Sequence, residues 1–116
     1  MFTLIIGLPN SGKTSYSNNY ENVIHADNYK TKEVKEFVSK ADGDIVVEGI
    51  YILRSDREPL IKSYNGLKKC VVMDTHVDVC ISRENRGRFP NLVTGMNEWF
   101  EIPTFDEGWD IIEIRR

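Results

Sequence analysis

The stretch Gly7-Leu8-Pro9-Asn10-Ser11-Gly12-Lys13-Thr14 decides the fold. It fits the pattern G-x-x-x-x-G-K-[ST], and it directly follows the apolar run of residues 2–6. Glycines in this pattern let backbone N–H groups turn inward around phosphate oxygens, and the start of the following helix adds its dipole. The stretch therefore predicts a phosphate loop, residues 7–14, between a buried strand and a helix.

The residue types inside the phosphate loop indicate a nucleotide and a metal ion. Lys13 would reach the β- and γ-phosphates, and the Thr14 hydroxyl would ligate Mg²⁺, so we expect ATP and Mg²⁺ as cofactors. Asn10 stands where many such loops carry glycine, and asparagine tolerates the positive φ that this position can require. The alternative, a structural turn that binds nothing, does not explain lysine and threonine at these two positions. The predicted nucleotide-binding residues are Gly7, Leu8, Pro9, Asn10, Ser11, Gly12, Lys13, Thr14 and Ser15.

Composition indicates one globular domain over residues 1–116. Hydrophobic residues make up 41% of the chain and charged residues 28%, with no linker-like run. The apolar runs are far shorter than the roughly 20 residues of a membrane span, and Met1 leads into one without a basic leader. Cys70 and Cys80 fall within elements that are expected to be buried, which is typical of reduced thiols. We expect a soluble, cytoplasmic protein, and its net charge of −3 argues against a broad surface for nucleic-acid duplexes.

Short apolar runs alternate with helical patterns along the chain. The runs cover residues 2–6, 23–26, 45–47, 70–73 and 109–114. The first four are almost continuously hydrophobic, as in parallel strands that are buried on both faces. Strands that alternate with helices predict a three-layer α/β/α sandwich whose ligands bind at the carboxyl ends of the strands.

Local signals predict where several helices begin. Ser55 and Glu58 have the spacing of a capping box at the start of one helix, and Gly66 is expected to end it. Thr75 is expected to cap a helix that presents Cys80 to the core. Further helices are predicted after Lys13, over residues 34–41 and over residues 92–99.

Three further stretches join the phosphate loop in a family resemblance. The second predicted strand ends in Ile24-His25-Ala26-Asp27-Asn28-Tyr29, the third ends in Glu48-Gly49, and arginines stand at 83, 86 and 88. With these stretches the chain resembles small P-loop kinases of the polynucleotide 5′-hydroxyl kinase-like group, and more distantly nucleoside and nucleotide kinases and zeta-type toxins. The resemblance covers nearly the whole chain. It implies a P-loop NTPase fold whose five-stranded, mainly parallel sheet has the order 2-3-1-4-5, and transfer of the γ-phosphoryl group of ATP to a hydroxyl.

The resemblance also implies roles for two acids. Asp27 matches the aspartate that contacts the acceptor hydroxyl and takes its proton, the alternative being a helix N-cap or a turn residue. Glu48 would hold a Mg²⁺-bound water, the alternative being a solvated glutamate at a strand end. His25 is expected to be a packed residue.

The arginines match a lid over the triphosphate in the resembled family. Arg83 would act with Arg86 or Arg88 on the charge that develops during transfer, and the choice between the last two stays open. The alternative is a solvated basic end of a helix. Arg57, at the start of another helix, is expected to be an exposed charge.

The acceptor is the part of the function that these residues define least. The resemblance favours the 5′-hydroxyl of a DNA or RNA end, with a nucleoside or another small metabolite as the alternative. A third alternative is a nucleotide-binding regulatory module without turnover. Tyr29 and Trp99 would suit stacking on a base, but core packing is the expectation for both. The sequence leaves the oligomeric state open.

Overall fold

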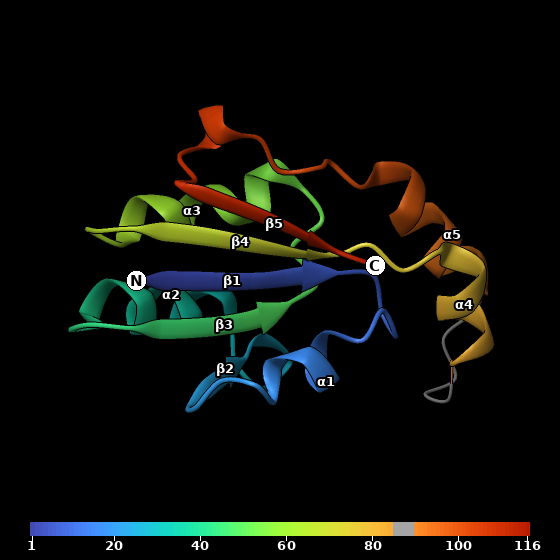
Figure 1. Cartoon of the computed structure of the whole chain (residues 1–116), viewed down its shortest axis with the longest axis horizontal. Coiled ribbons are helices and arrows are strands. Elements are labelled where there is room, and N and C mark those ends of the chain that lie inside the picture. The colour runs from blue at the N-terminus through green and yellow to red at the C-terminus, as the bar shows by residue number, and fades with distance from the viewer. Residues whose placement is uncertain (85–89) are drawn as a thin grey trace.

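The fold is built on one parallel sheet. The computed structural model describes residues 1–84 and 90–116. The strands are β1 (Phe2–Gly7), β2 (Val23–His25), β3 (Ile45–Gly49), β4 (Lys68–Met73) and β5 (Ile111–Arg115). They lie in the order β2-β3-β1-β4-β5, and all four pairings are parallel (Figure 1). The predicted strand order is confirmed.

Helices lie on both faces of this sheet and beyond its carboxyl edge. They are α1 (Lys13–Ser17), α2 (Thr31–Lys40), α3 (Arg54–Ser63), α4 (Val77–Ser82) and α5 (Pro90–Trp99), with short 3-10 turns η1 (Ala26–Asn28) and η2 (Phe105–Glu107). α2 and α3 pack side by side on one face, α1 covers part of the other, and α4 and α5 lie past the strand ends (Figure 1). None of the described helices is long and apolar enough to cross a membrane.

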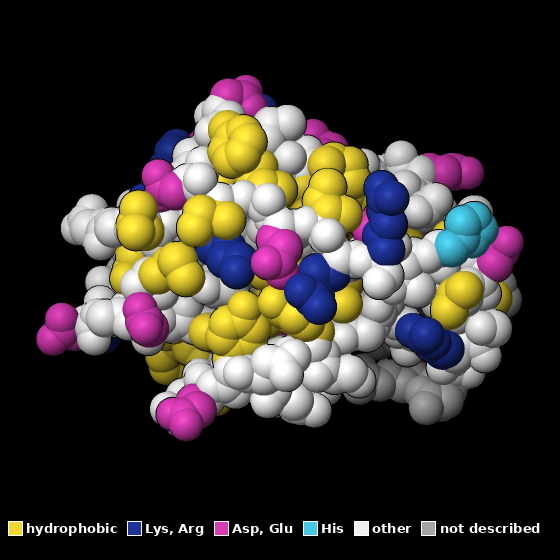
Figure 2. Space-filling view, in the orientation of Figure 1, with side chains coloured by type: hydrophobic (Ala, Val, Ile, Leu, Met, Phe, Trp, Pro, Cys, Tyr) yellow, Lys and Arg dark blue, Asp and Glu magenta, His cyan; other side chains and the backbone are white. Residues whose placement is uncertain are grey.

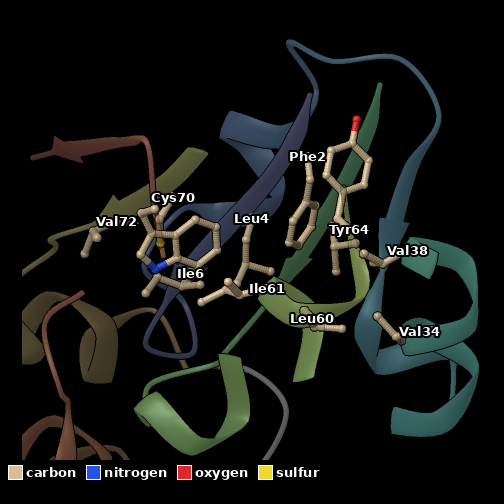
Figure 3. Close-up of a cluster of buried hydrophobic side chains, with 12 residues drawn as sticks. Phe2, Leu4, Ile6, Val34, Val38, Leu60, Ile61, Tyr64, Cys70 and Val72 are labelled. Carbon is tan, nitrogen blue, oxygen red and sulfur yellow. The ribbon is translucent and has the colours of Figure 1, made fainter. Parts of the chain in front are cut away.

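The hydrophobic core forms around β1, because this strand is paired on both sides and buried along its whole length. Its alternate residues Phe2, Leu4 and Ile6 face α2 and α3 (Figure 3). Ile5 faces the other way, toward tyrosines from α1 and the residues after it. Both faces of β1 are therefore covered, which explains its almost continuously apolar sequence.

The structure corrects two of the predicted helix starts. Leu53 is the N-cap of α3, so Ser55 lies inside the first turn and forms no capping box. His76 is the N-cap of α4, and its ring accepts a hydrogen bond from the Asp78 N–H at 3.1 Å. The Thr75 hydroxyl instead donates to the Ser11 carbonyl at 2.6 Å. A tertiary contact to the phosphate loop has taken the place of the local cap that the sequence suggested.

Arg57 is buried, and the prediction that it is an exposed charge is wrong. Its side chain is 0% exposed, and it donates to the two carboxylate oxygens of Glu107 at 2.9 and 3.0 Å. Burial alone would raise the pKa of the Glu107 carboxyl, but hydrogen bonds from Arg57 and from the Thr104 N–H outweigh it and lower that pKa. A third hydrogen bond, 3.0 Å long, joins Arg57 to the Tyr51 carbonyl. One side chain thus ties α3 to η2 and to the loop after β3.

We predict that Arg57→Ala lowers the free energy of unfolding by about 3–5 kcal/mol, because it leaves the Glu107 carboxylate buried without its partner. Arg54→Ala is the matched control, since Arg54 pairs with Asp106 at the surface and such pairs contribute about 1 kcal/mol or less. Urea denaturation measures both. The loss of unfolding free energy in Arg57→Ala should be largest above the ordinary glutamic acid pKa of about 4.3. It should shrink as the pH falls below that value, because Glu107 then becomes protonated and no longer needs a cationic partner. Equal and small losses of unfolding free energy in the two variants would contradict the buried Arg57–Glu107 pair.

Candidate active site

The carboxyl ends of the strands bring the predicted site residues to one edge of the sheet. A pocket of about 490 Å³ lies there, and it is lined by Pro9, Asn10, Gly12, Lys13, Thr14, Ser15, Asp27, Glu48, Ile50 and Arg83. The phosphate loop follows β1, Asp27 follows β2, and Glu48 is near the end of β3. Arg83 follows α4. Residues far apart in the sequence therefore share one cavity. Arg86 and Arg88 lie outside the described residues.

The phosphate loop has the backbone conformation that its sequence predicts. Asn10 and Gly12 both have positive φ, 64° and 97°, so asparagine occupies the left-handed region that it tolerates. The Asn10 amide donates to the Cys80 carbonyl at 3.2 Å and to the Glu84 carboxylate at 2.7 Å. Arg83 in turn donates to the Asn10 carbonyl at 3.3 Å. The end of α4 thus holds the loop in place, a contact that sequence reasoning missed.

Lys13 lies buried at the centre of the phosphate loop. Its side chain reaches back across the loop, where the ammonium donates to the Leu8 carbonyl at 2.7 Å. Thr14 and Ser15 are exposed at the pocket wall. A cation held inside a loop of this shape, beside a cavity of this size, fits the phosphates of a nucleotide.

The donor set fits Mg²⁺ that arrives with a nucleotide better than a metal held by protein alone. Within residues 1–84 and 90–116, no cluster of three or more His, Cys, Asp or Glu side chains is placed to bind a metal. Mg²⁺ usually keeps several waters and takes one or two protein oxygens together with substrate phosphates. Thr14 and Glu48, which line the same pocket, are of this kind.

His25 is a partner of Glu48, which the sequence did not indicate. The two residues are direct neighbours on β2 and β3, and the His25 Nδ1 lies 3.0 Å from the Glu48 Oε2. Glu48 is only 6% exposed, so the alternative of a solvated glutamate at a strand end is wrong. The signal that would have found the pair is the alignment of the two strands. If β2 and β3 pair in parallel and end at the same edge of the sheet, residues 25 and 48 lie side by side.

Asp27 lies between the nucleotide pocket and a second pocket of about 300 Å³. The second pocket is lined by Ala26, Asp27, Tyr29, Thr31, Val34, Ile50, Tyr51, Ser55, Asp56 and Pro59. Asp27 and Ile50 line both cavities. Asp27 lies within η1, whose N-cap is His25, so it does not cap a helix. Its place at the junction is the one that a residue between two reactants would need.

Two aromatic residues that we expected in the core are at the surface. Tyr29 is 43% exposed at the second pocket, where its ring meets that of Phe37 edge-on at 5.0 Å. Trp99 is 64% exposed at the end of α5. Apolar type alone led to the wrong prediction for both, because neither lies on a face that a neighbouring element covers.

Comparison with known proteins establishes the fold. No protein-family model matches the chain, and no curated protein matches it in sequence. Among solved structures, a gluconokinase from Sinorhizobium meliloti 1021 is similar with a TM-score of 0.73, over 97% of this chain and 79% of the other. Its sequence identity is 19%. The chain therefore has the fold of a small P-loop kinase, while the likeness gives no support to the polynucleotide 5′-hydroxyl kinase-like group in particular.

We predict that Lys13→Met weakens ATP binding by roughly 10–100-fold, because a hydrogen bond to a charged group contributes about 1.5–3 kcal/mol. Methionine keeps the buried stem and removes the ammonium. Calorimetry should show little change for adenosine, which has no phosphates, and none for Lys62→Ala, an exposed lysine paired with Glu58. Unchanged ATP affinity in Lys13→Met would mean that the loop does not bind a triphosphate through this residue.

Proposed function

We propose that the protein transfers the γ-phosphoryl group of ATP to a hydroxyl of a small molecule. The observation that carries the proposal is the position of Asp27, which lines the nucleotide pocket and the second pocket together. A phosphoryl donor in the first cavity and an acceptor in the second would meet at this carboxylate. Phosphoryl transfer needs such an arrangement, with the acceptor oriented in line and a carboxylate within hydrogen-bond reach.

Each site residue then has a role. Lys13 and the backbone N–H groups of the phosphate loop hold the triphosphate, and Arg83, with Arg86 or Arg88, balances the charge that develops in transfer. Thr14 and Glu48 hold Mg²⁺ directly or through water, and His25 orients Glu48. Bound Mg²⁺ would neutralise charge on the β- and γ-phosphates.

Asp27 does the proton chemistry in this proposal. It accepts the acceptor's hydroxyl proton as the acceptor oxygen bonds to the γ-phosphorus. The bond from that phosphorus to the β–γ bridging oxygen breaks at the same time, and its electron pair leaves with ADP. The proton thus ends on Asp27, and the phosphoryl group ends on the acceptor oxygen.

The small-molecule acceptor replaces the nucleic-acid 5′ end that the sequence resemblance favoured. Support comes from the structural neighbour, which is named a gluconokinase and so acts on a small molecule. The surface supports it too. On the face seen in Figure 2, the described basic side chains are scattered among acidic and hydrophobic ones rather than joined in a stripe, and the net charge is −3. Nucleic-acid backbones attract extended basic surfaces.

The acceptor class is tested by a screen with γ-labelled ATP. We expect label on free sugars, amino alcohols or nucleosides, and much less on 5′-hydroxyl DNA or RNA oligonucleotides, because the net charge is −3 and the described side chains on the face in Figure 2 form no basic stripe that would attract a nucleic-acid backbone. Label that goes best to an oligonucleotide end would restore the nucleic-acid acceptor. ATP binding without transfer to any hydroxyl would favour a regulatory module.

Asp27→Asn separates binding from chemistry. The amide keeps the size of the side chain but cannot take a proton, so we expect phosphoryl transfer to fall roughly 10²–10⁴-fold while ATP affinity and the fold stay unchanged. Single-turnover kinetics with the best acceptor measures the change. Asp42→Asn, an exposed acid in the turn after α2, is the control and should keep full activity. Near-normal turnover in Asp27→Asn would remove this residue from the mechanism.

A further inference from the structure

The second pocket has a one-sided charge. Two carboxylates, Asp27 and Asp56, line it together with the hydroxyl-bearing side chains of serine, threonine and two tyrosines and with apolar side chains. Its described lining contains no lysine or arginine. An anion that entered would meet like charge with no basic partner in that lining, which is a repulsion of the kind that sets specificity.

The arginine that contacts Tyr51 already has an acidic partner. Arg57 donates to the Tyr51 carbonyl, and its charge is balanced by the buried Glu107 carboxylate. Burial, and then the negative charges of Asp56, Asp27 and Glu48, raise the pKa of the Tyr51 hydroxyl to about 12. The Tyr51 hydroxyl is therefore neutral at physiological pH and adds no charge to the pocket.

Tyr51 forms part of the wall of the second pocket, and its backbone and ring are both constrained. Its backbone has φ 38°, which is rare for a residue with a side chain and is strained. Its ring lies over Gly49, where a Cβ would come within 2.6 Å of a ring carbon. The Arg57 hydrogen bond restrains this strained residue, and Gly49 leaves room for its ring; such strain is common at functional sites.

We propose that the second pocket selects a hydroxyl acceptor without negative charge, and that Asp56 accepts a hydrogen bond from an amino or hydroxyl group of that acceptor. This rests on the proposed function, in which Asp27 receives the proton of the reacting hydroxyl. Within the described residues the Asp56 carboxylate accepts no hydrogen bond and makes no ion pair, and the residue is exposed at the pocket. It therefore remains available to a second group on the same molecule.

Two lysines lie near the second pocket, and they would favour an anionic acceptor instead. Lys35 and Lys62 line an adjoining hollow that shares Ser55 and Pro59 with the second pocket. Lys62 pairs with Glu58 at 2.5 Å, so Lys35 is the one that an anionic acceptor would use. Lys35→Ala consequently belongs in the test, as the variant that should leave acceptor binding unchanged.

Three six-carbon sugar derivatives of different charge test the charge preference. Glucosamine is a cation, glucose is neutral and gluconate is an anion at pH 7. Each is titrated into the wild-type protein while amide NMR signals of Ala26, Tyr51 and Ser55 are followed. We expect binding at least about tenfold tighter for glucosamine or glucose than for gluconate. Tighter binding of gluconate, or no response of these signals to any of the three probes, would overturn the proposal.

Variants then assign the preference to Asp56. Asp56→Asn should weaken glucosamine binding by roughly tenfold and leave glucose binding within about twofold, because only the cation loses a charge partner. Asp42→Asn is the matched control and should change neither. Unchanged glucosamine binding in Asp56→Asn, or gluconate binding that Lys35→Ala abolishes, would refute the role given to Asp56.

The NMR titration does not depend on catalysis, so the two proposals fail separately. If the neutral and cationic probes bind as expected but no label moves from ATP to any hydroxyl, the kinase function is wrong and the charge selectivity of the pocket stands. If label moves fastest to gluconate or to another anionic hydroxyl compound, the kinase function stands and the selectivity is wrong.

Discussion

The fold depends on β1, which is paired with β3 on one side and β4 on the other and is buried on both faces. Because every strand runs parallel to it, every strand ends at the same edge of the sheet. The residues that follow β1, β2 and β3 therefore meet there, although they come from separate parts of the sequence. A central strand that is hidden from water thus determines where polar chemistry occurs.

The sequence could predict whatever depends on local pattern or on a specific motif. The phosphate loop, the alternation of strands and helices and the acids at the ends of β2 and β3 all belong to this class. The order of the strands came from the kinase resemblance, and the structure confirms it. The positions of Lys13, Thr14, Asp27, Glu48 and Arg83 around one pocket follow directly from these two sources.

Contacts between distant residues could not be predicted in the same way. Arg57 and Glu107 are 50 positions apart, and Asn10 and Glu84 are 74 apart. Arg57 looks like an ordinary charge on a helix, and only the packing of η2 against α3 shows that it is buried. Such pairs have no periodicity or motif, because each depends on how two elements meet in space. The same holds for the His25–Glu48 pair, which needed the register of β2 and β3.

The buried Arg57–Glu107 pair links the stability of the fold to the shape of the second pocket. Removing two charges from water is costly, and well-packed apolar residues in their place are often at least as stable. Stability alone is thus a weak reason for such a pair. Arg57 also donates to the carbonyl of Tyr51, whose backbone is strained. An apolar pair would fill the same space but could not make that hydrogen bond, so the distinctive contribution of the ion pair is the contact that its arginine makes with this wall of the second pocket.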